Sequence, residues 1–158
     1  MEIKFKRLHP DAVIPAKAHE SDYCYDVVAV SEQEVAPNVW RYGLGFALQI
    51  DKELVGYMGE DANRVYRHPG VIGIDFRPRS SVWKTGMVLS NCIGTIDEGY
   101  TGEISAVFYH VMLNMPRYKV GDRIGQIKVG VTTPIRFVEV DELELTDRGA
   151  NGYGSSGK

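Results

Sequence analysis

Short runs rich in Val, Ile, Phe and Tyr recur along the chain, while an apolar stripe of helical period is almost absent. Gly, Pro, Asn and Asp separate these runs, and they supply the turns that successive strands require. So many short strands predict an all-β domain, a distorted barrel or jelly roll. The pattern predicts strands over these ranges: Ile3–Leu8, Tyr25–Ser31, Leu44–Ile50, Val71–Arg77, Met87–Ile93, Glu103–Leu113, Arg123–Val131 and Ile135–Val140.

Two segments depart from this pattern. Residues 51–69 show neither clear alternation nor a helical stripe, so we expect a surface excursion with a short helical turn near Asp61 to Val65. After Asp141 the chain turns acidic, and from Arg148 it is mostly Gly, Ser, Ala and Asn, which can bury little and predicts disorder without a ligand. The sequence thus predicts one domain over residues 1–140 and a flexible arm over residues 141–158.

Composition narrows the possible partners. A chain of 158 residues with 44% hydrophobic and 25% charged residues fits one soluble domain with a sizeable core. A net charge of −3 argues against general binding to nucleic acid or to a membrane surface. Because the start of the chain carries no uninterrupted apolar run, we expect neither a secretory signal nor a membrane span, and hence a cytoplasmic protein.

The segment from Asn91 to Ile104 offers the first candidate chemistry. Apolar stretches on both sides of Glu98 and Gly99 predict a β-hairpin, with glycine at the tight turn. Such a hairpin would expose main-chain donors and acceptors beside one carboxylate, Asp97, which could serve as a general base. On the hairpin alone, the alternative is that Asp97 caps a turn and that Tyr100 belongs to the core.

Three further segments could bind an anion. Arg79, Ser80 and Ser81 offer a forked donor and two hydroxyls to a phosphate, although a solvated turn is the alternative. Within Gly121–Gln126, either Arg123 or Gln126 could face a ligand, and a structural role is favoured for Arg123. The segment from Arg148 to Lys158 carries a cation, an aromatic ring and hydroxyls that could close over a phosphorylated base. Its alternative is an inert terminus, and its P-loop-like spacing lacks the helix that a P-loop needs.

Taken in order along nearly the whole chain, these segments resemble the trimeric dUTPase family. The five matching stretches are Tyr23-Cys24-Tyr25-Asp26-Val27, Pro78-Arg79-Ser80-Ser81, Gly94-Thr95-Ile96-Asp97-Glu98-Gly99-Tyr100-Thr101-Gly102, Asp122-Arg123-Ile124-Gly125-Gln126 and Arg148 through Gly157. Tyr23 and Cys24 stand where the family usually has Ala and Gly, and Tyr153 replaces the usual Phe. Residues 51–69 also look longer than the corresponding family segment.

The resemblance implies an activity and a site. Asp97 would activate a water that attacks the α-phosphorus of dUTP, giving dUMP and pyrophosphate, with Mg²⁺ held by the triphosphate. This reaction would limit uracil in DNA and supply dUMP for thymidylate synthesis. Tyr100 would pack under the deoxyribose. The implied substrate-binding residues are Arg79, Ser80, Ser81, Asn91, Thr95, Ile96, Tyr100, Gln126, Arg148, Tyr153, Gly154 and Ser155.

The resemblance also implies a role for the remaining motif acid and an assembly. Asp26 would support the water shell of the metal, as an outer-sphere group. Family members are homotrimers with shared sites, and the tail of one chain crosses to a neighbour. Two rival functions stay open: a dCTP deaminase-like enzyme, and a nucleotide-gated regulatory or binding protein with the same fold. The deaminases need a glutamate at the position of Val107, which argues against the first rival.

Overall fold

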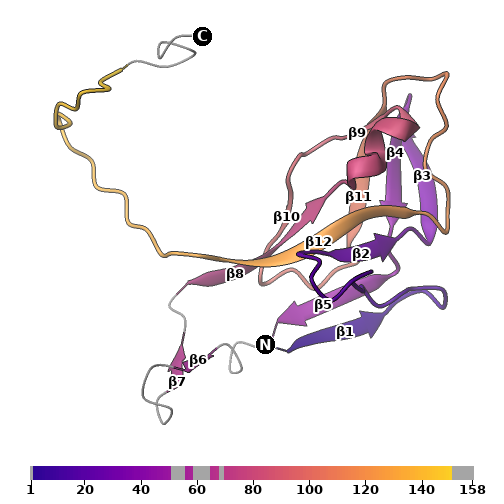
Figure 1. Cartoon of the computed structure of the whole chain (residues 1–158), viewed down its shortest axis with the longest axis horizontal. Coiled ribbons are helices and arrows are strands. Elements are labelled where there is room, and N and C mark those ends of the chain that lie inside the picture. The colour runs from indigo at the N-terminus through magenta and orange to yellow at the C-terminus, as the bar shows by residue number, and fades with distance from the viewer. Residues whose placement is uncertain (1, 51–55, 59–64, 68–69, 151–158) are drawn as a thin grey trace.

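The computed structural model describes residues 2–50, 56–58, 65–67 and 70–150. Nearly all regular structure in them is antiparallel strand, joined by one short 3-10 helix, η2 (Figure 1). Two four-stranded sheets have the orders β10-β8-β12-β2 and β3-β4-β11-β9, and β1-β5 and β6-β7 form pairs. The elements are β1 Ile3–Arg7, β2 Tyr25–Val28, β3 Ser31–Ala36, β4 Val39–Gly43, β5 Phe46–Ile50, β6 Gly56–Met58, β7 Val65–Arg67, β8 Val71–Arg77, η2 Ser80–Thr85, β9 Met87–Leu89, β10 Gly94–Ile96, β11 Ser105–His110 and β12 Arg123–Thr132.

The core lies between the two four-stranded sheets. Phe108 on β11 is fully buried, and its ring meets Phe76 on β8 and Tyr42 on β4 edge to face, with centroids 6.3 and 6.0 Å apart. The Tyr42 hydroxyl donates to the Tyr118 carbonyl at 2.9 Å, so this buried polar group is satisfied. The predicted all-β fold is therefore confirmed, because alternating apolar residues on β8 and its neighbours pack from two faces into one core.

Sequence alternation located β8 at its observed bounds but missed the hairpin of β3 and β4. The predicted strand Tyr25–Ser31 ends at Val28, and Ser31 already begins β3. Most of β3 is exposed, so it carries little apolar pattern, and its turn to β4 depends on Asn38 at a φ of 61°. The predicted strands Met87–Ile93 and Glu103–Leu113 shorten to β9 and β11.

The predicted hairpin around Glu98 and Gly99 is wrong. β10 pairs with β8, whereas β11 pairs with β4 and β9, so the two strands that flank the turn belong to different sheets. Gly99 also does not adopt the positive φ that a tight hairpin turn would require. In the expected helical turn, residues 61–64 lie outside the described residues, and Val65 begins the strand β7.

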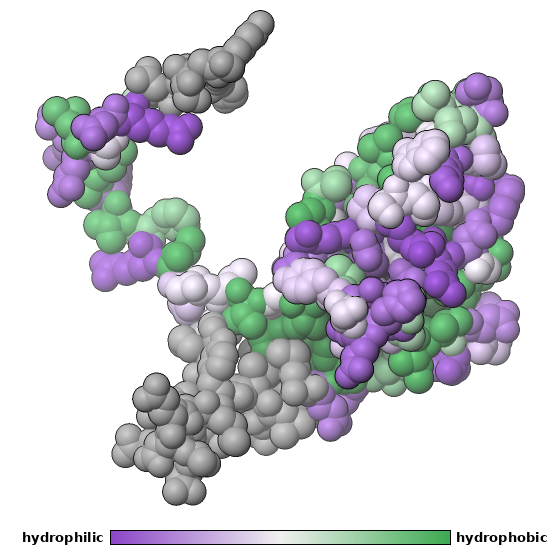
Figure 2. Space-filling view, viewed as in Figure 1, coloured by the Kyte–Doolittle hydropathy of each residue, from purple (hydrophilic) through white to green (hydrophobic). Residues whose placement is uncertain are grey.

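The strand predicted at Ile135–Val140 does not form within this chain. Past β12 the polypeptide runs away from the body of the molecule, as the orange and yellow ribbon shows (Figure 1). Hydrophobic and hydrophilic residues are mixed along it (Figure 2), and Ile135 and Phe137 are 73% and 89% exposed. A strand needs a neighbour for its main-chain hydrogen bonds, and these residues have none within the part of the chain described. No helix among the described residues has the length and apolarity to cross a membrane.

Candidate active site

A cluster of charged side chains gathers around Asp26 on β2. Oδ1 of Asp26 lies 3.3 Å from Nε of Arg79, and Oδ2 lies 3.2 Å from Nη1 of Arg123. The Asp26 side chain is only 19% exposed, so both ion pairs are partly shielded from water. One carboxylate thus holds two guanidinium groups from segments that are far apart in the sequence, one of them 97 residues away. We call Asp26, Arg79, Arg123 and Gln126 the cation cluster.

A bulge in β12 brings two of these side chains to the same face. The register between β12 and β2 shifts between Arg123 and Gly125, and Gln126 then lies opposite Asp26. In a regular strand, residues three apart point to opposite faces, but an extra residue reverses the alternation after it. Arg123 can therefore bind Asp26 while Gln126 shares the Asp26 face, and the Gln126 amide reaches the Pro78 carbonyl at 3.5 Å. Gly125 faces the core, where an added Cβ would lie 2.2 Å from the Phe76 ring.

The predicted Arg79-Ser80-Ser81 segment lies at the start of η2, after β8 ends at Arg77. Arg79 has the extended backbone of a residue that precedes a helix, and its carbonyl accepts a hydrogen bond from the Val82 amide at 3.0 Å. Ser80 is exposed and Ser81 is half-buried. Both hydroxyls therefore follow directly after a guanidinium that Asp26 orients, a chemistry suited to an anion such as phosphate.

A second group of predicted residues lines a small concavity at the end of β10. Its volume is about 190 Å³, and its lining includes Thr95, Ile96, Asp97 and Tyr100. The Asp97 carbonyl accepts the Tyr100 amide at 3.0 Å, which turns the chain back just after the acid. Asp97 is exposed, so its carboxylate can reach a water or a ligand. The concavity thus combines one accessible carboxylate, an aromatic ring and the main chain of an edge strand. We call Thr95, Ile96, Asp97 and Tyr100 the base loop.

Asn91 lies beside the base loop rather than within it. Its side-chain amide is 3.6 Å from the position that a Cβ would take at Gly94, the first residue of β10. Asn91 itself is exposed. The predicted uracil-binding group of Asn91, Thr95 and Ile96 is therefore contiguous along this edge of the sheet.

Within a single chain, the base loop and the cation cluster lie far from each other. Ile96 lies opposite Ile74 and Gln126 lies opposite Arg77, so Asp97 is level with residue 73 of β8. Four residues of strand and the width of two strand spacings then separate the Asp97 and Gln126 backbones by roughly 16 Å. Arg79 lies farther away still, past the end of β8. The base loop and the cation cluster are therefore separate regions on the surface of one chain.

The predicted residues of the arm are only partly within the described structure. Arg148 is exposed and lies next to a turn in which the Gly149 amide donates to the Thr146 carbonyl at 3.0 Å. Tyr153, Gly154 and Ser155 lie outside the described residues.

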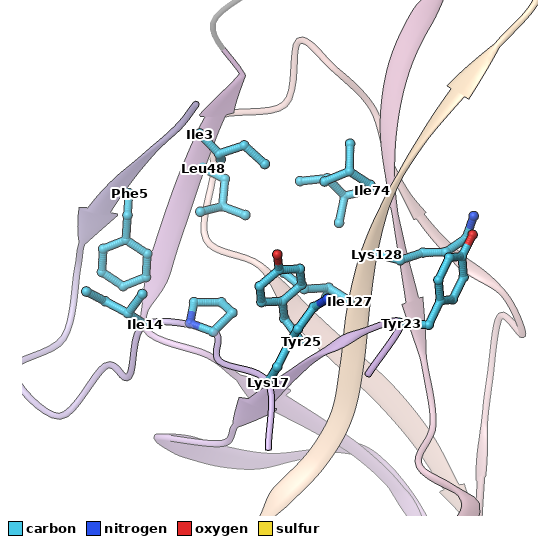
Figure 3. Close-up of a pocket in the computed structure, with 12 residues that line it drawn as sticks. Ile3, Phe5, Ile14, Lys17, Tyr23, Tyr25, Leu48, Ile74, Ile127 and Lys128 are labelled. Carbon is cyan, nitrogen blue, oxygen red and sulfur yellow. The ribbon is translucent and has the colours of Figure 1, made fainter. Parts of the chain in front are cut away.

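A larger concavity, of about 580 Å³, contains none of the predicted substrate-binding residues (Figure 3). Most of its lining is apolar, and the strands β1, β5, β8 and β12 contribute to it. Its two lysines lie against aromatic rings, with Lys17 5.2 Å from the Tyr25 centroid and Lys128 5.6 Å from the Tyr23 centroid. Tyr23, an unusual residue in its motif, is thus accommodated on the surface. This lining contains neither the acid of the smaller concavity nor any residue of the cation cluster.

Sequence reasoning missed two contributors to the site. The pairing of Arg123 with Asp26 could not be seen, because a bulge and a distant register produce it. The other is Glu103, which lines the small concavity and accepts a hydrogen bond from the Gly45 amide at 2.9 Å. Nothing in the sequence marks Glu103, since charged residues at strand starts are common. Within the described residues, no three His, Cys, Asp or Glu side chains lie together as a metal-binding group.

Comparisons with known proteins agree on one family. The dUTPase family model matches residues 11–157. A deoxyuridine 5'-triphosphate nucleotidohydrolase of Nocardia farcinica is 34% identical over 98% of this chain and 85% of its own length. A protein of the same name from Wolinella succinogenes is 32% identical over 100% of this chain and 95% of its own length.

Solved structures show the same fold. The dUTPase of Staphylococcus bacteriophage 80alpha with dUPNHPP has a TM-score of 0.73 at 22% identity, over 99% of both chains. A dUTPase of phage phi11 of S. aureus, described as coordinating a structural Mg(II) ion, has a TM-score of 0.65 at 18% identity, over 92% of this chain and 100% of its own. With a family model that covers nearly its whole length, this chain belongs to the dUTPase family.

Proposed function

We propose that this protein hydrolyses dUTP to dUMP and pyrophosphate. The observation that carries the proposal is the position of Asp97, an exposed carboxylate that lines a concavity together with Tyr100 and the β10 main chain, in a chain of the dUTPase family. Relatives along nearly the whole chain are named as nucleotidohydrolases of deoxyuridine 5'-triphosphate. A cytoplasmic enzyme that acts on free nucleotide, without nucleic-acid or membrane partners, stays our prediction.

Each half of the site has a task in this reaction. Asp97 takes a proton from a water that attacks the α-phosphorus, which requires hydrogen-bond reach to that water. Asn91 and the β10 main chain at Thr95 and Ile96 bind uracil, and Tyr100 packs under the deoxyribose. Arg79 and Gln126 of the cation cluster bind the phosphates together with the hydroxyls of Ser80 and Ser81, and charge-assisted hydrogen bonds make the contacts of Arg79 strong.

The residues fit Mg²⁺ carried by the substrate better than Mg²⁺ held by the protein. Both carboxylate oxygens of Asp26 already form ion pairs with arginines, and no described cluster of acids offers several direct ligands. Hard cations of this size bind phosphate oxygens and keep several waters. When bound to the triphosphate, Mg²⁺ neutralises the charge that develops during transfer. Asp26 remains the predicted outer-sphere acid, reaching such an ion only through water.

The separation of the base loop from the cation cluster supports a shared site. Since roughly 16 Å divides the Asp97 and Gln126 backbones in one chain, we infer that different copies supply the two groups to one substrate. A homotrimer of closed symmetry provides three equal interfaces of this kind. In this proposal the arm, residues 141–158, crosses to a neighbouring site, where Arg148, Tyr153, Gly154 and Ser155 cover the nucleotide.

The arm gives a direct test of closure. Deleting residues 147–158 should reduce kcat for dUTP by about a hundredfold, because water then enters the site and the clamp on the triphosphate is lost. The melting temperature should stay within about 2 °C of the full chain, since residues 147–150 are exposed. A truncated protein with normal turnover would show that closure by the arm is not part of the mechanism.

Deamination of dCTP is the rival enzyme activity, and one residue separates the two. Val107, at the position where a deaminase needs glutamate, is half-buried on β11 opposite Arg41 and cannot transfer a proton. The test measures pyrophosphate and ammonia released from dUTP and dCTP with Mg²⁺. We expect pyrophosphate from dUTP alone. Ammonia from dCTP would favour deamination, and no product from either nucleotide would favour a regulatory protein.

A further inference from the structure

Glu103 lies where the loop after Asp97 joins β11, and both its main chain and its side chain are engaged. The Glu103 carbonyl accepts a hydrogen bond from the Tyr100 hydroxyl at 2.9 Å. Its carboxylate Oε1 accepts one from the Gly45 amide, also at 2.9 Å. Gly45 has a φ of 69° and lies between β4 and β5. A single residue therefore connects the tyrosine of the base loop to a fixed turn beside the core.

The Glu103 carboxylate lies in a space that is open because residue 43 is a glycine. A Cβ at Gly43 would lie 2.6 Å from Oε1, so a side chain at this position would displace the carboxylate. Main-chain hydrogen bonds of 3.0 Å, from Leu44 to the Ile104 carbonyl and from Ile104 to the Phe46 carbonyl, hold the same junction. Ile104 itself is buried. The carboxylate is thus received by a rigid part of the fold.

Tyr100 is 47% exposed, but one side of its ring lies against Gly102. A Cβ at Gly102 would lie 2.6 Å from the Tyr100 hydroxyl oxygen and 2.7 Å from Cζ, so the ring lies directly against the glycine. The Tyr100 amide binds the Asp97 carbonyl at 3.0 Å. Because the hydroxyl is held by Glu103, the ring cannot turn away without losing that bond and its contact with Gly102.

We propose that Glu103 is a positioning residue that sets the selectivity of this site for deoxyribose over ribose. It acts through Tyr100: by fixing the loop end that receives the tyrosine hydroxyl, it keeps the ring close enough to exclude a 2′-hydroxyl. This inference rests on the proposed function, in which Tyr100 packs under the sugar. A ring that could move by a fraction of its width would admit UTP, while Asp97 would still act on dUTP.

The test compares Glu103→Ala with Glu103→Gln, because glutamine keeps an oxygen at the position that accepts the Gly45 amide. For each variant and the unaltered protein, kcat/KM is measured with dUTP and with UTP. We expect Glu103→Gln to keep the dUTP preference within about twofold, and Glu103→Ala to lower it about tenfold, mainly through faster use of UTP. An unchanged preference in Glu103→Ala would overturn the proposal, as would an equal loss on both substrates, which is the mark of a merely structural role.

Gly102→Ala keeps the proposal testable if Glu103→Ala fails to fold. Its added Cβ displaces the Tyr100 ring while Glu103 stays intact, so it should lower the dUTP preference by a similar factor. Unaltered preference in a folded Gly102→Ala protein would contradict a role for ring position. If the unaltered protein does not hydrolyse dUTP at all, the proposed function fails instead. The ring is then followed by the NMR signal of Tyr100, assigned with Tyr100→Phe, which Glu103→Ala must still shift.

Discussion

The cation cluster and the base loop are built by different forces. Ion pairs between distant segments hold the cluster, with Asp26 at 3.3 Å from Arg79 and 3.2 Å from Arg123. Main-chain hydrogen bonds between close neighbours hold the base loop, as between Tyr100 and Asp97. Removal of a single charge should therefore disrupt the cation cluster. The base loop should instead be disrupted by a side chain that fills the space beside its backbone. Within the base loop, only Asp97 carries a carboxylate, the group that the proposed mechanism uses as its base.

Removing that carboxylate should give the largest effect. Asp97→Asn keeps the shape of the side chain but cannot take a proton, so kcat for dUTP should fall by about 10²–10⁴-fold. Asp97 is exposed, and the fold should be unaffected. Pyrophosphate release measures kcat, and calorimetry with a non-hydrolysable dUTP analogue measures binding, which should change by less than about threefold.

The neighbouring acid is the matched control for this variant. Glu98 lies one residue along and accepts the Ile72 amide at 3.4 Å, away from the catalytic role. Glu98→Gln should keep most of the activity. Comparable losses in Asp97→Asn and Glu98→Gln would mean that negative charge on the loop, and not proton transfer by Asp97, is what the reaction needs.

A mixture of damaged chains tests whether the two regions of different copies meet. Arg79→Ala and Asp97→Asn should each be nearly inactive alone. Co-expressed in equal amounts, they should regain about a quarter of normal activity, because random assembly gives that share of sites an intact residue from each region. Arg79→Ala mixed with Gln126→Ala should show no more than the mean activity of the two variants alone, since both changes lie in the cation cluster. If the first mixture had no activity, both regions of the active site would have to come from the same chain.

Neutralising Asp26 tests what the ion pairs contribute. Asp26→Asn raises the local positive charge, which by itself would strengthen phosphate binding. It also frees two arginines, each of which carries about 2 kcal/mol of rotamer entropy that binding must then remove. We expect orientation to dominate and affinity for the dUTP analogue to fall about tenfold, also in EDTA, as measured by calorimetry.

Asp75 supplies the matched control for Asp26. It lies on β8 and pairs with Arg77 at 3.3 Å and with Lys128 at 3.5 Å, outside the cation cluster. Asp75→Asn should change affinity by less than about twofold. If the loss in Asp26→Asn vanished in EDTA, the metal's water shell would be the only role of Asp26, and the arginines would need no anchor.

The same contrast explains what could be predicted from the sequence. Local pattern located β8, whose Ile72, Ile74 and Phe76 alternate into the core, and local motifs located the base loop. Long-range register was beyond reach: β10 and β11 belong to different sheets, and a bulge in β12 turns Arg123 towards Asp26. The strand β3 was missed because most of it is exposed and it carries little apolar pattern. The segment Ile135–Val140 has a strong apolar pattern, but its described residues have no neighbouring strand within this chain.

The smallest effect should come from an ion pair that belongs to neither region. Arg117 binds Glu32 through both nitrogens, at 2.8 and 3.1 Å, and its guanidinium lies 3.5 Å from the Trp40 ring centroid. The hydrogen bond from Arg117 lowers the pKa of Glu32 below its ordinary value of 4.5. Because the pKa of Glu32 is lower in the folded protein than in the unfolded chain, the ion pair stabilises the fold at pH values above the unfolded pKa. This stabilisation is lost as the pH falls through the folded pKa.

Glu32→Gln should therefore reduce the free energy of unfolding at pH 7 by about 0.5–1 kcal/mol. The difference from the unaltered protein should narrow as the pH falls below 4.5 and close as the pH passes the lowered pKa of folded Glu32, where this glutamate becomes neutral. Urea unfolding at several pH values measures this difference. Because Glu32 lies on β3, in a different sheet from the strands β10 and β2 that carry the two regions, kcat and KM for dUTP should stay constant. A change in either would mean that β3 and β4 transmit strain to the site, and that the two regions are less independent than their contacts indicate.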